Sequence, residues 1–84
     1  MNEELLQNLN KLHTTPMGVD RIRRNLGLGV EIKDVVTWCK NQIESPEANI
    51  TRTGKNWYCT IGGCIITVNA YSYTIITAHK VNKT

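Results

Sequence analysis

The side chains of this sequence that can do chemistry are imidazoles, hydroxyls and basic groups rather than carboxylates. His13 and His79 are the two histidines, and Thr77 stands two residues before His79. An imidazole titrates near neutral pH and can therefore take up or release a proton in a reaction. Glu47 is the only acidic residue after Pro46, so the sequence gives little support to catalysis by two carboxylates. His79 is the leading candidate for proton transfer, and His13 is the second.

The basic residues favour recognition of phosphate. Arg21, Arg23 and Arg24 lie within four residues of one another, and Arg52 and Lys55 flank a predicted turn. Guanidinium and ammonium groups form charge-assisted hydrogen bonds with phosphate oxygens. The alternative is an ordinary solvated helix face, since the net charge is only +3.

Signatures of cofactor, metal or nucleophile sites are absent from the sequence. It has no glycine-rich phosphate loop, HExxH, GxSxG or paired CxxC motif. The sequence has three cysteines, Cys39, Cys59 and Cys64. An odd number argues against a closed set of disulfides, and their spacing is not that of a metal site, so they are predicted to be free, buried thiols. We therefore expect no metal and no cofactor.

Length and composition predict one globular domain over residues 1–84. Hydrophobic residues make up 40% and charged residues 20%, which argues against disorder. No apolar run approaches the roughly 18 residues of a membrane span. The acidic N-terminus shows no signal peptide, so we expect a cytoplasmic protein.

Hydrophobic periodicity predicts three helices followed by four strands. The helices are expected at about 2–13, 16–26 and 32–43, with Thr15 capping the second and Pro46 ending the third. Alternating residues predict strands at 48–53, 56–61, 64–69 and 74–81. This order predicts an α+β fold with three N-terminal helices packed on one face of a four-stranded antiparallel β-meander.

The Gly62-Gly63 turn fixes the register of the central hairpin. It pairs Trp57 with Val68 on an apolar face that also carries Cys59, Ile61, Cys64 and Ile66, and it leaves a polar face with Tyr58, Thr67 and Asn69.

The last strand has two possible registers. A simple hairpin buries Thr77 and His79. A bulge or an odd loop instead turns them toward Tyr58 and Thr67, and sends Ile76 and Ala78 into the core. The second register is favoured because it leaves fewer polar groups buried.

Two resemblances follow from these residues. The sequence resembles a family of small bacterial and phage domains with no assigned function. The segments that carry this resemblance are 12–15, 21–26, 55–58, 65–69 and 74–80. More distantly, the basic helix followed by the meander is similar to the barnase–EndoU–colicin–RelE class of ribonuclease folds. That resemblance implies that Arg21 or Arg24 holds a phosphate, that Thr77 orients it and that His79 acts as acid or base, without a metal. The sequence departs from barnase in having no glutamate in the sheet.

Two functions are consistent with these patterns. The first is a small RNA-directed protein of the toxin-like ribonuclease class, active or decayed. The residues expected to contact RNA are Arg24, Arg52, Lys55, Tyr58, Thr67, Asn69 and Lys80. The second is a non-enzymatic interaction protein, such as a phage-encoded inhibitor or a toxin–antitoxin partner, which would bind a protein or a nucleic acid through the same surfaces.

Overall fold

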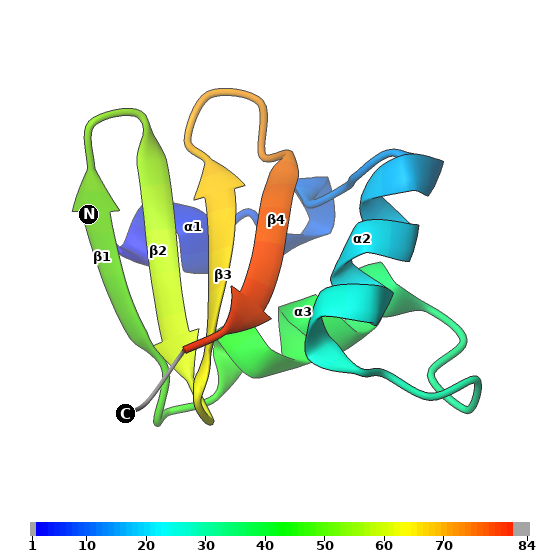
Figure 1. Ribbon diagram of the computed structural model, residues 1–84. Coiled ribbons are helices and arrows are strands. Elements are labelled where there is room, and N and C mark those ends of the chain that lie inside the picture. The colour runs from blue at the N-terminus through cyan, green and yellow to red at the C-terminus, as the bar shows by residue number, and fades with distance from the viewer. Residues whose placement is uncertain (1, 82–84) are drawn as a thin grey trace.

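The computed structural model describes residues 2–81, which form helices followed by an antiparallel sheet (Figure 1). The helices are α1 (Asn2–Leu6), the short 3₁₀ helix η1 (Leu9–Lys11), α2 (Pro16–Leu26) and α3 (Val35–Glu44). The strands are β1 (Asn49–Thr53), β2 (Asn56–Ile61), β3 (Cys64–Asn69) and β4 (Ile75–Lys80), and they lie in that order across the sheet. The α+β class and the four-stranded meander are therefore confirmed.

The N-terminal helix is interrupted, so the prediction of one helix over 2–13 is wrong in part. The Asn8 side chain donates to the Glu4 carbonyl at 2.8 Å, and the Asn8 backbone leaves the helical region. Asparagine competes in this way with the backbone hydrogen bonds of a helix. Leu5, Leu9 and Leu12 are nevertheless all buried, as their spacing predicts.

Helix α2 has the predicted bounds because both of its ends are capped. The Thr15 hydroxyl accepts a hydrogen bond from the Gly18 N–H at 3.0 Å, and Pro16 occupies the first turn. At the other end Gly27 adopts φ = 66°, which lets the Leu28 N–H donate to the Arg23 carbonyl at 2.9 Å.

Helix α3 begins at Val35, later than the predicted start near Ile32. The Asp34 carboxylate caps it by accepting from the Thr37 N–H at 3.1 Å. Ile32 consequently lies in the preceding loop and is only partly buried.

The central hairpin has the predicted register. Ile61 pairs with Cys64, Cys59 with Ile66, and Trp57 with Val68. The turn residues Gly62 and Gly63 have φ of 56° and 79°, which L-amino acids with side chains rarely adopt. The apolar face of this hairpin is therefore the core face of the sheet.

A β-bulge sets the register of β4. Val68 pairs with Ile75, but Thr67 pairs with Thr77, so Ile76 is an extra residue. Beyond the bulge, Ala78 is 0% exposed on the core face and His79 faces Ile65 on the open face. The favoured register is therefore right from Thr77 onward.

The same bulge makes the prediction for Ile76 wrong. Ile75 takes the core position and is 1% exposed, whereas Ile76 is 41% exposed. The reason is that the extra residue lies inside β4 rather than in the loop before it. Ile75 therefore keeps the simple hairpin pairing, and only the residues after the bulge change faces.

Helices α1 and α3 lie behind the sheet, while α2 lies beside β4 (Figure 1). The arrangement with all three helices on one face is thus only partly observed. The core contains side chains from the helices, from β2, β3 and β4, and from the loops between them: Leu5, Leu9, Leu12, Ile22, Leu26, Val35, Cys39, Ile43, Trp57, Cys59, Ile61, Cys64, Ile66, Val68, Ala70, Tyr73, Ile75 and Ala78. Within residues 2–81, no helix is both long and apolar enough to cross a membrane.

The outer edge of β4 is covered by the segment that precedes and includes α2. The Ile75 N–H donates to the His13 carbonyl at 2.8 Å, and the Thr14 hydroxyl donates to the Ile75 carbonyl at 3.0 Å. Further along, the Asn25 amide donates to the Ala78 carbonyl at 3.2 Å. These bonds fix α2 against the strand that carries Thr77 and His79.

Candidate functional site

The open face of the sheet carries a row of four side chains, one from each strand. Thr51 pairs with Tyr58, Tyr58 with Thr67, and Thr67 with Thr77. His79 lies on the same face two residues beyond Thr77, and side chains so spaced on a strand are about 7 Å apart. The structure thus brings together Tyr58, Thr67, Thr77 and His79, the group that the bulged register predicts, but Thr67 is only 6% exposed and offers little surface for the predicted contact with RNA.

Three of the predicted basic and polar contacts do not belong to this face. Arg52 pairs with Trp57 on the core face, and its guanidinium lies 5.6 Å from the centroid of the Trp57 ring. Lys80 pairs with Cys64, also on the core face. Lys55 lies in the exposed turn between β1 and β2. A single RNA surface that includes Arg52, Lys55 and Lys80 is therefore not formed.

Asn69 shapes a turn with its side-chain oxygen. Its side-chain oxygen accepts from the N–H groups of Tyr71 and Ser72, both at 2.9 Å, and from the Ser72 hydroxyl at 3.2 Å. These bonds use the side-chain oxygen, so only the amide nitrogen of Asn69 can still donate to a ligand.

Arg21 and Arg24, two of the three arginines of α2, lie about 60° apart around the helix and differ in how far they are from β4. Asn25 contacts β4, while Ile22 and Leu26 face the core. At about 100° per residue, Arg21 lies about 40° around the helix from Asn25, on the side away from Ile22. Arg21 therefore lies toward the open-face side of the β4 edge. Arg24 is about 100° from Asn25 and faces away from the strand.

His13 belongs to a separate hydrogen-bonded chain at the start of β4. Its Nδ1 lies 2.9 Å from the Lys11 carbonyl, and its Nε2 lies 3.1 Å from the Thr74 hydroxyl. Because a carbonyl only accepts, Nδ1 carries the proton and Nε2 accepts from Thr74 in the neutral ring. The Thr74 oxygen in turn lies 2.7 Å from the Ser72 hydroxyl.

The two histidines lie at opposite ends of β4. His13 bridges to Thr74, and His79 is five residues further along the same strand. At about 3.3 Å per residue, roughly 16 Å separates the two ends. His13 therefore lies apart from His79 and Thr77, at the other end of β4.

Thr74, Ser72 and Asn25 are polar residues at this edge that the sequence analysis did not single out. Asn25 follows Ile22 by three residues, at the border of the buried stripe, and such a polar border residue is a usable signal. The pairing of Thr74 with His13 spans 61 residues and has no local signal.

The three cysteines are free and buried, as predicted. Burial raises the pKa of the Cys39 and Cys59 thiols to about 12, and for Cys39 the nearby Cys64 and Cys59 add to this effect. Burial also raises the pKa of Cys64. Among residues 2–81 no three histidine, cysteine, aspartate or glutamate side chains are grouped so as to hold a metal ion.

These raised pKa values predict a loss of stability in alkali. A thiol ionises near pH 9 when unfolded but only near pH 12 when folded, so its stabilising contribution is complete below pH 9 and declines above it. We expect the free energy of unfolding to fall above pH 9 by up to about 1.4 kcal/mol per pH unit for each of Cys39 and Cys59. Urea unfolding between pH 8 and 10.5 measures the slope, and Cys59→Ala should reduce it. An unchanged slope in that variant would contradict the assignment.

The fold and the open face define a small α+β protein whose antiparallel sheet presents hydroxyl, phenol and imidazole groups. The chain belongs to the family described as "Protein of unknown function (DUF3781)", which matches residues 6–79. Neither the curated proteins nor the solved structures include a match. The predicted membership of a family of unknown function is confirmed, while no comparison bears out the similarity to ribonucleases.

Proposed function

We propose that this protein binds RNA at the open-face side of β4 and cleaves it without a metal ion. The observation that carries the proposal is the bulge at Ile76, which turns Thr77 and His79 outward beside the arginine-bearing side of α2. Arginine, hydroxyl and imidazole groups are a sufficient set for cleavage by the neighbouring ribose hydroxyl.

Each group has a distinct task in this proposal. His79 accepts the proton of the ribose 2′-hydroxyl as the oxygen attacks the adjacent phosphorus. Arg21 offsets the charge that develops on the phosphate oxygens, and the Thr77 hydroxyl donates a hydrogen bond to one of them. The leaving 5′-oxygen takes its proton from water. Tyr58, exposed in the middle of the face, provides a ring on which a base stacks. The products end in a 2′,3′-cyclic phosphate and a 5′-hydroxyl.

The position of Arg21 leads to a prediction about salt. The affinity for a single-stranded oligoribonucleotide should fall as salt rises, and Arg21→Gln should flatten the logarithmic slope by about 0.7, the value for one contact with single-stranded nucleic acid. Arg24→Gln is the matched variant, and its slope should stay close to that of the unchanged chain. Fluorescence anisotropy between 50 and 300 mM salt measures both slopes. Equal effects of the two substitutions would count against the proposed side of α2.

A second candidate function is protein binding by the same face. None of its outward-facing residues on the four strands is a lysine, arginine, aspartate or glutamate, and Tyr58 and Ile76 are exposed there. Depletion of charge around an exposed tyrosine is typical of the centre of a protein interface. An antitoxin or an inhibited target would suit it. Three results would favour this function over the first. A protein partner should bind with an affinity that does not depend on salt, and Tyr58→Arg should abolish that binding. The protein should also show no cleavage of RNA.

A further inference from the structure

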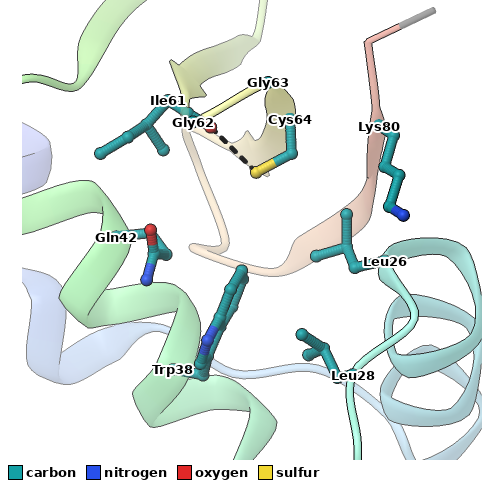
Figure 2. Close-up of a pocket in the computed structure, with 9 residues that line it drawn as sticks. All are labelled: Leu26, Leu28, Trp38, Gln42, Ile61, Gly62, Gly63, Cys64 and Lys80. Atoms are coloured by element: carbon teal, nitrogen blue, oxygen red, sulfur yellow. Dashed lines mark hydrogen bonds between the residues drawn. The ribbon is translucent and has the colours of Figure 1, made fainter.

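A surface pocket lies on the core side of the sheet, separate from the open face. It has a volume of about 210 Å³ and is lined by residues from the end of α2, from α3, from the β2–β3 turn and from β4: Leu26, Leu28, Trp38, Gln42, Ile61, Gly62, Gly63, Cys64 and Lys80. Figure 2 shows Trp38, Gln42 and Leu26 pointing into the same space from two different helices. His79 is on the opposite side of β4 from the pocket residue Lys80.

The walls of this pocket are mainly apolar, with Gln42 and Lys80 as the polar side chains, and the Trp38 ring makes one wall flat. Trp38 is half-buried, and so is Leu28 on the loop after α2. The Cys64 thiol is already engaged, since it donates to the Ile61 carbonyl at 3.1 Å. Partly exposed tryptophan and leucine side chains gain from covering by another apolar surface.

Lys80 is the only charged residue among those that line the pocket. Within residues 2–81 its ammonium group has neither a hydrogen bond nor an ion pair, although it lies near the C-terminal end of α2 at Gly27. It is not required as a helix cap, because the Arg23 and Arg24 carbonyls accept from the N–H groups of Leu28 and Gly27. The ammonium is therefore available to an incoming anion.

We propose that this pocket binds a small organic anion with a flat apolar body. The body packs against Trp38 and Leu28, and its carboxylate or a similar group pairs with Lys80. The volume is below the roughly 300–1,000 Å³ of sites for drug-sized ligands, so the body has one or two rings. The complementary charge selects an anion, since no acidic side chain faces the pocket to attract a cation.

The test uses two probes of nearly equal shape, 2-naphthoate and its neutral counterpart 2-naphthamide. Titration of the labelled chain followed by amide NMR measures both dissociation constants. We expect 2-naphthoate to bind with Kd of about 1 mM or lower and about three- to fivefold more tightly than the amide. The shifted resonances should come from the end of α2, from α3 and from the turn at Gly62.

Two lysine variants make the test specific. Lys80→Gln should remove the preference for the carboxylate and leave the affinity for 2-naphthamide unchanged. Lys55→Gln, at an exposed turn outside the pocket, should keep the preference. Both lysines are exposed, so neither change threatens folding. Absence of binding at 10 mM, equal affinity for the two probes, or shifts centred on the open face would each overturn the proposal. Because the probes contain no phosphodiester, these outcomes are independent of RNA cleavage.

Discussion

Replacing His79 with alanine is expected to lower RNA cleavage by about 10²- to 10⁴-fold, the usual contribution of a positioned proton-transfer group. The side chain is exposed on the open face, so its removal should leave the melting temperature nearly unchanged. Single-turnover cleavage of a labelled oligoribonucleotide measures the rate, and analysis of the product ends detects the cyclic phosphate. Binding of the same oligonucleotide should weaken much less than cleavage.

A parallel His13→Ala variant decides which imidazole takes the proton. The His13 ring forms hydrogen bonds with the Lys11 carbonyl and the Thr74 hydroxyl. We therefore expect this change to lower the free energy of unfolding, because these contacts at the edge of β4 are lost. If cleavage survives His79→Ala and disappears in a folded His13→Ala protein, the reacting group lies at the other end of β4 and the proposed mechanism is wrong. Thr77→Val should lower cleavage by an intermediate factor, because it removes the hydrogen bond proposed from Thr77 to the phosphate while keeping the shape of the side chain.

The second large effect is expected in the core. Ile66 is fully buried on β3, and Ile66→Ala should lower the free energy of unfolding by about 2–5 kcal/mol through lost burial and a residual cavity. Its neighbour Thr67 is on the opposite face and is 6% exposed. Thr67→Val keeps the branched shape of the side chain and replaces its hydroxyl with a methyl group, so it should cost only about 1 kcal/mol, as a typical single substitution does. Urea unfolding of the three proteins measures the difference, and a larger loss for Thr67→Val would contradict the assignment of faces.

The parts of the fold that the sequence predicted well are those with local causes. Thr15 and Pro16 mark the start of α2 and Gly27 marks its end, and they give its bounds correctly. Gly62-Gly63 fixes the central hairpin because a two-residue turn allows one register. From that register, the apolar and polar faces of β2 and β3 follow directly.

The parts that the sequence could not predict depend on contacts between distant segments. The pairing of His13 with Thr74 separates the two histidines, and nothing near either residue indicates it. The sequence supports a bulge in the loop and a bulge in the strand equally. The prediction that Ile76 is buried is therefore wrong, although the predicted outward orientation of Thr77 and His79 is correct. The core-face position of Lys80 follows from the same bulge, because every residue of β4 after the bulge lies on the face opposite to the one that a simple hairpin would give it.

The unequal edges of the sheet limit how copies of this chain can associate. The outer edge of β4 is occupied by His13, Thr14 and Asn25, whereas no backbone hydrogen bond from residues 2–81 reaches the outer edge of β1. A strand from another molecule can therefore join only at β1. Two copies that pair through their β1 strands use up both open edges, so edge-to-edge association stops at a twofold pair instead of continuing into a fibre.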